Sequence, residues 1–146
     1  MTKYLYVLAA VAALASSQAS AEQAPYAGME KRSIKAMSSE RVADIKAGKG
    51  VVYALTAELN GYPGPRHVQD LAEKLKLNPL QIKKTQFLFD TMQGEAKALG
   101  GEMIAREAKF EALFAGGLID EPNLQTSVTA IAEIEGRLRA THLKYT

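Results

Sequence analysis

The stretch NPLQIKKTQFLFDTMQGEAKALGGEMIAREAKFEALFAGG, from Asn78 to Gly117, decides the fold. No proline follows Pro79 in it, and apolar residues recur at steps of three, four and seven, which places them along one face of an α-helix. These residues are Leu88, Met92, Ala96, Leu99, Met103, Phe110 and Phe114. The spacing predicts one long helix from Pro79 to about Phe114.

Both ends of this helix are marked by residues that are typical of helix termini. Asn78 is a good N-cap, Pro79 suits the first helical position, and Gln81 follows the cap by three residues. The side chains of Asn78 and Gln81 are therefore expected to bond to each other's backbone N–H, as in a capping box. Gly116-Gly117 ends the helix, because glycine turns left-handed without steric cost.

A second helix is expected from Glu121 to about Leu143, with Asp120 as its cap. Its apolar stripe consists of Leu124, Val128, Ile131, Ile134 and Leu138. The connection between the two helices is short, so they should return as an antiparallel hairpin. Their lengths differ, which leaves the stripe near Phe87–Met92 to be covered by upstream helices or by a second copy of the chain. A homodimer is the expected assembly.

Three shorter helices are expected upstream. They are Glu40–Ala47, capped by Ser38 or Ser39, then Val51–Leu59 and Pro65–Lys76. No strand pattern stands out. The predicted fold is all-α, an elongated antiparallel helical hairpin with shorter N-terminal helices.

The first residues read as a secretory signal peptide. Lys3 precedes an uncharged apolar run, Tyr4–Ala15, and Ala19-Ser20-Ala21 supplies a small-x-small cleavage site. The run has about twelve residues, too few for the ~20 of a membrane-spanning helix. We expect cleavage after Ala21, export to the periplasm and no stable membrane insertion. The chain then divides into a signal peptide at 1–21, a mobile tail at 22–33 and a helical domain at 34–146.

The amino-acid composition excludes some classes of function. Cysteine is absent, which excludes thiol catalysis and thiolate metal sites, and the net charge of +2 falls to +1 without Lys3. That balance argues against a nucleic-acid binder. The segment 28–50 has a net charge of +3 and includes Lys31, Arg32 and Lys35. It is either a solvated flexible segment or a basic patch for acidic partners or lipid headgroups.

The residues offer little for catalysis, and we expect no enzyme. The two histidines, His67 and His142, are the candidate metal ligands if they converge with a carboxylate such as Asp70 or Glu135. The alternative is that His67 is a helix-start residue and His142 a frayed-end residue. The long helix also has two interpretations. Met92 and Met103 belong to the helix core, or they contribute to a surface that grips unfolded chains.

Three blocks resemble a known family. Leu77-Asn78-Pro79-Leu80-Gln81, at the start of a long helix, resembles the LTxxQ motif of Spy/CpxP-type periplasmic proteins, with Asn78 in the place of threonine. The block from Ala57 to Val68 is similar to one found in a less characterised branch, and so is Leu138–Leu143. The resemblance covers roughly 33–143.

The resemblance implies a four-helix hairpin fold, often a cradle-shaped dimer with a partly basic, partly apolar concave face. It implies ATP-independent binding of unfolded or misfolded proteins, or inhibition of a stress sensor kinase. Related members sense zinc, nickel or cobalt through histidine-rich sites, which this chain lacks. We therefore expect a chaperone-like stress protein. A metal sensor or buffer using His67 and His142, and an adaptor that docks on a sensor kinase through 31–49, are the alternatives.

Overall fold

The described part of the chain is helical. The computed structural model describes residues 25–50 and 52–146, and no strand occurs among them. The elements are η1 (Met29–Lys31), α1 (Ser39–Lys46), α2 (Leu55–Glu58), α3 (Pro65–Asp70), α4 (Pro79–Ala115) and α5 (Glu121–Lys144). The all-α prediction is confirmed. The expected signal peptide lies outside the described residues, and the mobility expected of 22–33 stays a prediction.

The long helix α4 begins at a complete capping box. The Asn78 side chain accepts a hydrogen bond from the Gln81 N–H at 2.9 Å, and the Gln81 side chain accepts one from the Asn78 N–H, also at 2.9 Å. The helix runs unbroken for 37 residues and ends at Ala115, just before the glycine pair. Two backbone donors that would otherwise lack partners are thus satisfied at its start.

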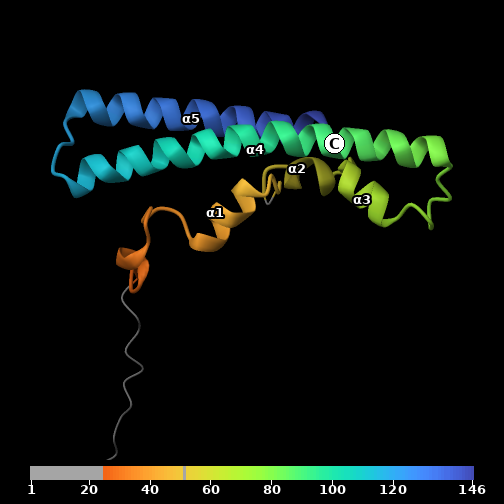
Figure 1. The fold of residues 1–146 in the computed structure, drawn as a ribbon, viewed down its shortest axis with the longest axis horizontal. Coiled ribbons are helices and arrows are strands. Elements are labelled where there is room, and N and C mark those ends of the chain that lie inside the picture. Colours follow the sequence, from red (N-terminus) through yellow and green to blue (C-terminus); the bar gives the residue numbers. More distant parts are fainter. Residues whose placement is uncertain (1–24, 51) are drawn as a thin grey trace, which may run out of the picture.

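Helices α4 and α5 lie side by side (Figure 1). The chain reverses over 116–120, and the Asp120 side chain caps α5 by accepting from the Asn123 N–H at 2.7 Å. Arg106 donates to the carbonyl of Ala130 at 2.7 Å, and Tyr145 donates to Glu95 at 2.8 Å. Because α5 ends beside Glu95, the first turns of α4 extend past it, and α3 lies next to them (Figure 1).

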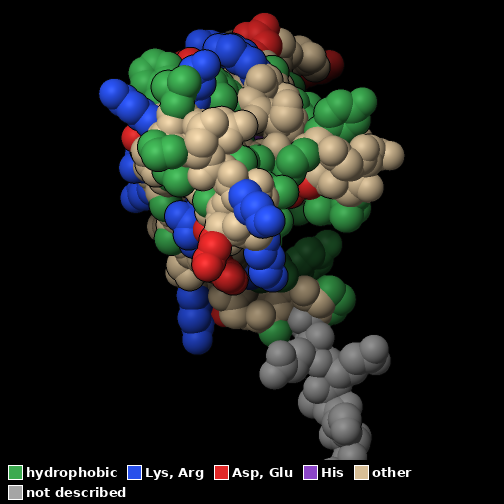
Figure 2. Space-filling model, turned by 90° about the vertical axis from the view of Figure 1, so that its right-hand side faces the viewer, with side chains coloured by type: hydrophobic (Ala, Val, Ile, Leu, Met, Phe, Trp, Pro, Cys, Tyr) green, Lys and Arg blue, Asp and Glu red, His purple; other side chains and the backbone are tan. Residues whose placement is uncertain are grey.

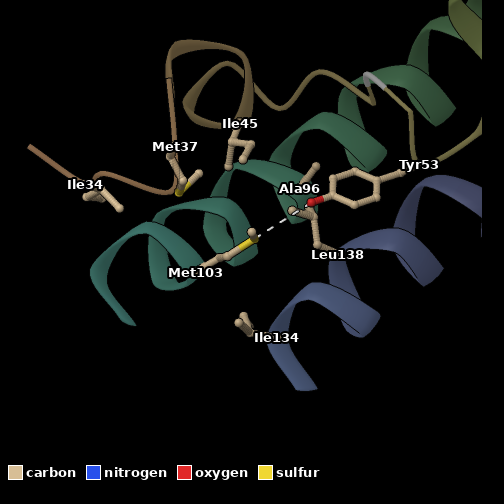
Figure 3. Packing of buried hydrophobic residues seen from close by; sticks show 8 residues of the cluster. All are labelled: Ile34, Met37, Ile45, Tyr53, Ala96, Met103, Ile134 and Leu138. Atoms are coloured by element: carbon tan, nitrogen blue, oxygen red, sulfur yellow. Dashed lines mark hydrogen bonds between the residues drawn. The ribbon is translucent and has the colours of Figure 1, made fainter. Parts of the chain in front are cut away.

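The core joins the two long helices to the segment that precedes α2. Its buried residues are Ile34, Met37, Ile45, Tyr53, Ala96, Met103, Ile134 and Leu138 (Figure 3). Half of them come from 34–53, so the N-terminal segment covers the middle of the α4 stripe. Gly100 of α4 makes this close approach possible, since a Cβ there would lie 2.6 Å from Cγ2 of Ile45 and 2.8 Å from its carbonyl oxygen.

Two expected helices are shorter than predicted. The helix expected over Val51–Leu59 is α2, four residues long, because the Tyr53 N–H bonds back to the Gly50 carbonyl in a turn and the Tyr53 ring enters the core. The helix expected over Pro65–Lys76 ends at Asp70 and continues as turns. Leu71 and Leu75 stay 44% and 52% exposed, so little burial stabilises a longer helix.

Within 25–50 and 52–146, no helix is long and apolar enough to cross a membrane.

Candidate functional site

A pocket forms where the end of α5 meets α2, α3, α4 and the loop after α1. Its volume is about 410 Å³. Both histidines line it, together with Glu58, Phe89, Met92 and Pro65. We call it the histidine pocket. The sequence predicted that His67 and His142 would be the candidate site residues, and the structure brings both to this pocket from helices that are far apart in the chain.

His142 is a buried side chain of α5 with 1% of its surface exposed. Its ring stacks on Tyr53, and the Gly50 backbone lies against it so closely that a Cβ there would be 3.2 Å from Nδ1. Burial lowers the pKa of His142, and it outweighs the carboxylate of Glu58, which acts in the opposite sense. The expectation of a frayed-end residue is wrong for His142, because the α2 segment and the α1–α2 loop cover it.

His67 differs from His142 in exposure. Its side chain is 56% exposed, and Nε2 lies 3.2 Å from Oε1 of Glu58. The carboxylate that joins the histidines at the pocket is therefore Glu58. Asp70, which the sequence offered as a ligand, pairs with Arg66 at 3.1 Å, and Glu135 pairs with Arg41 at 3.3 Å.

The arrangement of possible donor side chains bears on the metal interpretation. Among residues 25–50 and 52–146, no group of three or more histidine, cysteine, aspartate or glutamate side chains is arranged to hold a metal ion. His67, His142 and Glu58 thus share a pocket without forming a first coordination sphere of the usual three or four protein ligands. The pocket is lined by the buried ring of His142 and by apolar side chains such as Phe89 and Met92.

A second feature is an exposed apolar surface on the first turns of α4, beyond the end of α5. Leu80 is 60% exposed, Phe87 69% and Leu88 44%. We call these three residues the α4 patch. Lys83 and Lys84 line the same shallow hollow as the patch. Figure 2 faces this end of the molecule and shows hydrophobic side chains interspersed with lysine and arginine.

The two methionines expected at a partner surface are buried. Met92 is 8% exposed and Met103 2% exposed. Met103 packs under Tyr53 in the core (Figure 3), and Met92 lines the histidine pocket. Their burial corrects the prediction that they contact clients, and it supports the core interpretation of the stripe's middle.

The basic segment lies away from the α4 patch. Lys35 forms an ion pair with Glu111, and Arg32 donates to the Lys35 carbonyl at 3.3 Å. Glu111 follows Phe87 by 24 residues in one helix, which is roughly 36 Å at 1.5 Å per residue. Lys35 and its neighbour Arg32 therefore lie far from the uncovered apolar surface. The cations beside it are Lys83 and Lys84.

Sequence reasoning missed Glu58 and Tyr53, and it placed Phe87 only in a stripe that the second helix leaves uncovered, without predicting that Phe87 stays exposed. For Phe87 a signal was available, since 87–89 are three consecutive large apolar residues and cannot all face one side of a helix. Glu58 and Tyr53 gave no comparable signal, because their roles depend on how the segment before α3 folds back on α5.

Comparisons of the chain with protein-family models, with curated proteins and with solved structures give no match.

Proposed function

We propose that this chain is an exported, ATP-independent chaperone-like stress protein that binds unfolded or misfolded polypeptides in the periplasm. The observation that supports it most is the α4 patch, an apolar surface that neither α5 nor the N-terminal segment covers. An exposed apolar surface flanked by lysines can bind unfolded polypeptides without any chemical reaction.

Each part of the patch has a physical role in the proposal. Apolar side chains of a client supply affinity at about 25 cal/mol per Å² of buried surface. Lys83 and Lys84 attract acidic segments and speed the encounter. The patch lies on the outside of one helix and has no enclosing walls, so it accepts side chains of many shapes. Specificity for one sequence is not expected of such a surface.

The wider architecture belongs to the same proposal. We take α4 and α5 to be the antiparallel hairpin of a Spy/CpxP-like fold, an assignment supported by the capping box at Asn78 and by the paired contacts between the two helices. A homodimer that covers part of the α4 patch is the proposed assembly. Export is supported by the Ala19-Ser20-Ala21 site, and the intact mass of the exported chain should correspond to a start at Glu22.

The test is suppression of client aggregation by the chain 22–146 without nucleotide. Phe87→Ser with Leu88→Ser removes the aromatic and one leucine of the patch. The matched control is Phe114→Ser with Leu118→Ser, which removes two similarly exposed residues, one in the last turn of α4 and one in the connection that follows it. All four side chains are at least 44% exposed, so both variants should fold. We expect the first variant to lose most of the suppression near equimolar amounts and the control to keep it.

The outcomes separate the alternatives. Unchanged aggregation of several unrelated clients at several-fold excess of protein would contradict the proposal. Tight binding of one folded sensor domain without any effect on unfolded clients would favour the adaptor. A calorimetric zinc or nickel signal lost in both His67→Ala and His142→Ala would favour the metal sensor.

A further inference from the structure

His142 is a buried titratable side chain without a hydrogen-bond partner. It is 1% exposed, and among residues 25–50 and 52–146 neither of its ring nitrogens has a partner. A neutral imidazole has one N–H donor, whereas a protonated imidazole has two donors and a full charge. Because the surrounding residues enclose both nitrogens, that charge would be neither hydrated nor hydrogen-bonded. The structure therefore disfavours a proton on this ring.

One face of the ring is covered by a short segment of the chain. Tyr53 stacks on the ring, with the two planes inclined by 11°. Ala54 and Glu58, from the same segment, line the histidine pocket beside it. We call residues 52–58, which comprise this turn and helix α2, the α2 lid. Lifting the lid takes Tyr53 off the ring and admits water to it.

The α2 lid is held to the two long helices by few buried groups. Within 52–58 the buried residues are Tyr53 and Ala54, while Val52 is 56% exposed and Leu55 43%. The Tyr53 hydroxyl donates to Glu135 at 3.1 Å, and α2 itself has four residues. A segment with few buried apolar groups opens at a lower free energy than the whole domain. We therefore expect the lid to open locally while α4 and α5 stay packed.

Other ionisable groups surround His142. They are Lys49 from the loop after α1, Tyr53 and Glu58 from the lid, Arg66 and His67 from α3 and, near the end of α5, Glu95 from α4. The lysine and the arginine form ion pairs with Asp44 and Asp70, and Glu95 accepts a hydrogen bond from Tyr145. Among the described residues, no group supplies an acceptor to His142.

Glu58 and His67 are the neighbours that bear most on a proton at His142. The Glu58 carboxylate favours that proton, but burial outweighs it and lowers the pKa of His142. Glu58 also has a nearer partner, Nε2 of His67, at 3.2 Å. The side chain of His67 is 56% exposed, so it gains a proton in contact with water and without movement of the fold.

We propose that the α2 lid opens in acid, when His142 takes up a proton that the closed structure cannot accommodate. Histidine is the side chain whose ordinary pKa lies between pH 5 and 8. With the lid open, water reaches the His142 ring and its pKa returns toward 6.5, whereas burial keeps the pKa lower with the lid closed. The open state therefore binds the proton more strongly, and a falling pH favours opening. Opening also uncovers the ring of Tyr53 and the core residues around it, such as Met103 and Leu138 (Figure 3).

The experiment is amide hydrogen exchange of the chain 22–146, followed residue by residue by NMR between pH 7.5 and 5.5. The reporters are the N–H groups of Tyr53 and Glu58, which bond to the carbonyls of Gly50 and Ala54 at 2.7 and 3.0 Å. After correction for the intrinsic effect of pH on exchange, their opening constant should rise by up to about tenfold, the limit for one group with an open-state pKa of 6.5. Both should exchange faster than the buried Met103 and Ile134 of the long helices.

The two histidines of the chain provide a matched pair of variants. His142→Phe keeps an aromatic ring against Tyr53 and removes the titration, so the opening constant of the lid should no longer change with pH. His67→Gln removes the exposed histidine and leaves His142 as the one that titrates, so the rise in acid should persist. If His142→Phe does not fold, His67→Gln still decides the question, because loss of the rise there would contradict the assignment to His142.

Three further results would overturn the proposal. They are a lid whose opening constant is the same at pH 7.5 and 5.5, the full rise in His142→Phe, and lid amides that exchange no faster than those of Met103 and Ile134. The last result would mean that the lid opens only when the whole protein unfolds. None of these measurements uses a client, so a failed aggregation assay and a failed lid are separate results.

Discussion

The rings of Tyr53 and His142 are stacked, with centroids 5.9 Å apart and planes inclined by 11°. This contact joins the segment before α2 to the last turn of α5. Tyr53 also donates to Glu135 at 3.1 Å, and burial together with that carboxylate raises the pKa of Tyr53 to about 12. The stack therefore couples the N-terminal segment to α5 through two neutral rings at neutral pH.

The first prediction is that the protein becomes less stable in acid because of the buried His142. Burial lowers the pKa of His142 in the folded protein from its ordinary value of 6.5, so below that pH the unfolded chain binds a proton that the folded chain resists. The free energy of unfolding should fall as the pH drops from 7.5 to 5.5, by at most about 1.4 kcal/mol per pH unit for this one group. Thermal melts across that range measure it.

The comparison protein for this prediction is His142→Gln. Its amide cannot titrate, so the difference in melting temperature between it and the unchanged protein should shrink as the pH falls. The pKa of Glu111 is lowered by its hydrogen bonds from Lys35, and its effect on stability begins below its ordinary value of 4.5, outside the measured range. A constant difference between the two proteins from pH 7.5 to 5.5 would contradict the assigned role of His142.

A second prediction separates two adjacent glycines of α4. A Cβ at Gly100 would lie 2.8 Å from the backbone oxygen of Ile45, whereas a Cβ at Gly101 meets nothing within 4 Å. Gly100→Ala should destabilise the protein by about 1–2 kcal/mol, because overpacking outweighs the better helix propensity of alanine. Gly101→Ala should stabilise it by up to about 1 kcal/mol. Urea denaturation measures both, and equal effects would show that α1 does not pack at Gly100.

The third prediction concerns the start of α4. Asn78→Ala removes the side chain that accepts from the Gln81 N–H, and it should destabilise the protein by about 1 kcal/mol. Asn78→Ser keeps an acceptor at this position and should retain most of the stability. An unchanged melting curve for Asn78→Ala would mean that the first turn of α4 contributes nothing to the cooperative unit.

The sequence predicted the helices that carry their own end signals. The caps at Ser38, Asn78 and Asp120 each accept a backbone N–H in the structure, and the helices after them begin where the sequence placed them to within one residue. Capping and periodicity depend only on residues that are close in the sequence, so a single sequence is enough to recognise them.

The segment 52–76 was less predictable because its shape depends on tertiary contacts. Tyr53 lies in the turn before α2, although the sequence predicted it in a helix, because its side chain packs on His142 and donates to Glu135. The histidine pocket was anticipated only as two histidines that could converge, and its carboxylate, Glu58, was missed. The exposure of Phe87 was more predictable, because three large apolar residues at 87–89 cannot all face one side of a helix and because the second helix is too short to cover them.

The last prediction rests on the proposed function and asks which cations guide clients to the α4 patch. Lys83 and Lys84 line the hollow that contains Phe87, while Lys31 and Arg32 lie near Lys35, which pairs with Glu111. Coulomb attraction between exposed groups is largely screened beyond about 10 Å at 0.1 M salt. Only the nearby lysines should therefore affect the capture of an acidic client.

Lys83→Glu with Lys84→Glu should slow capture of an acidic unfolded client several-fold at low salt and remove most of its salt dependence. The matched control, Lys31→Glu with Arg32→Glu, makes the same change in net charge and should leave the capture rate within about a factor of two. Stopped-flow fluorescence of a labelled client at 20 and 300 mM salt, concentrations that span about 20 to 6 Å of screening length, measures both. Slower capture in the control alone would assign client guidance to the basic segment. Equal slowing in both variants would mean that net charge, and not the position of Lys83 and Lys84, governs the encounter.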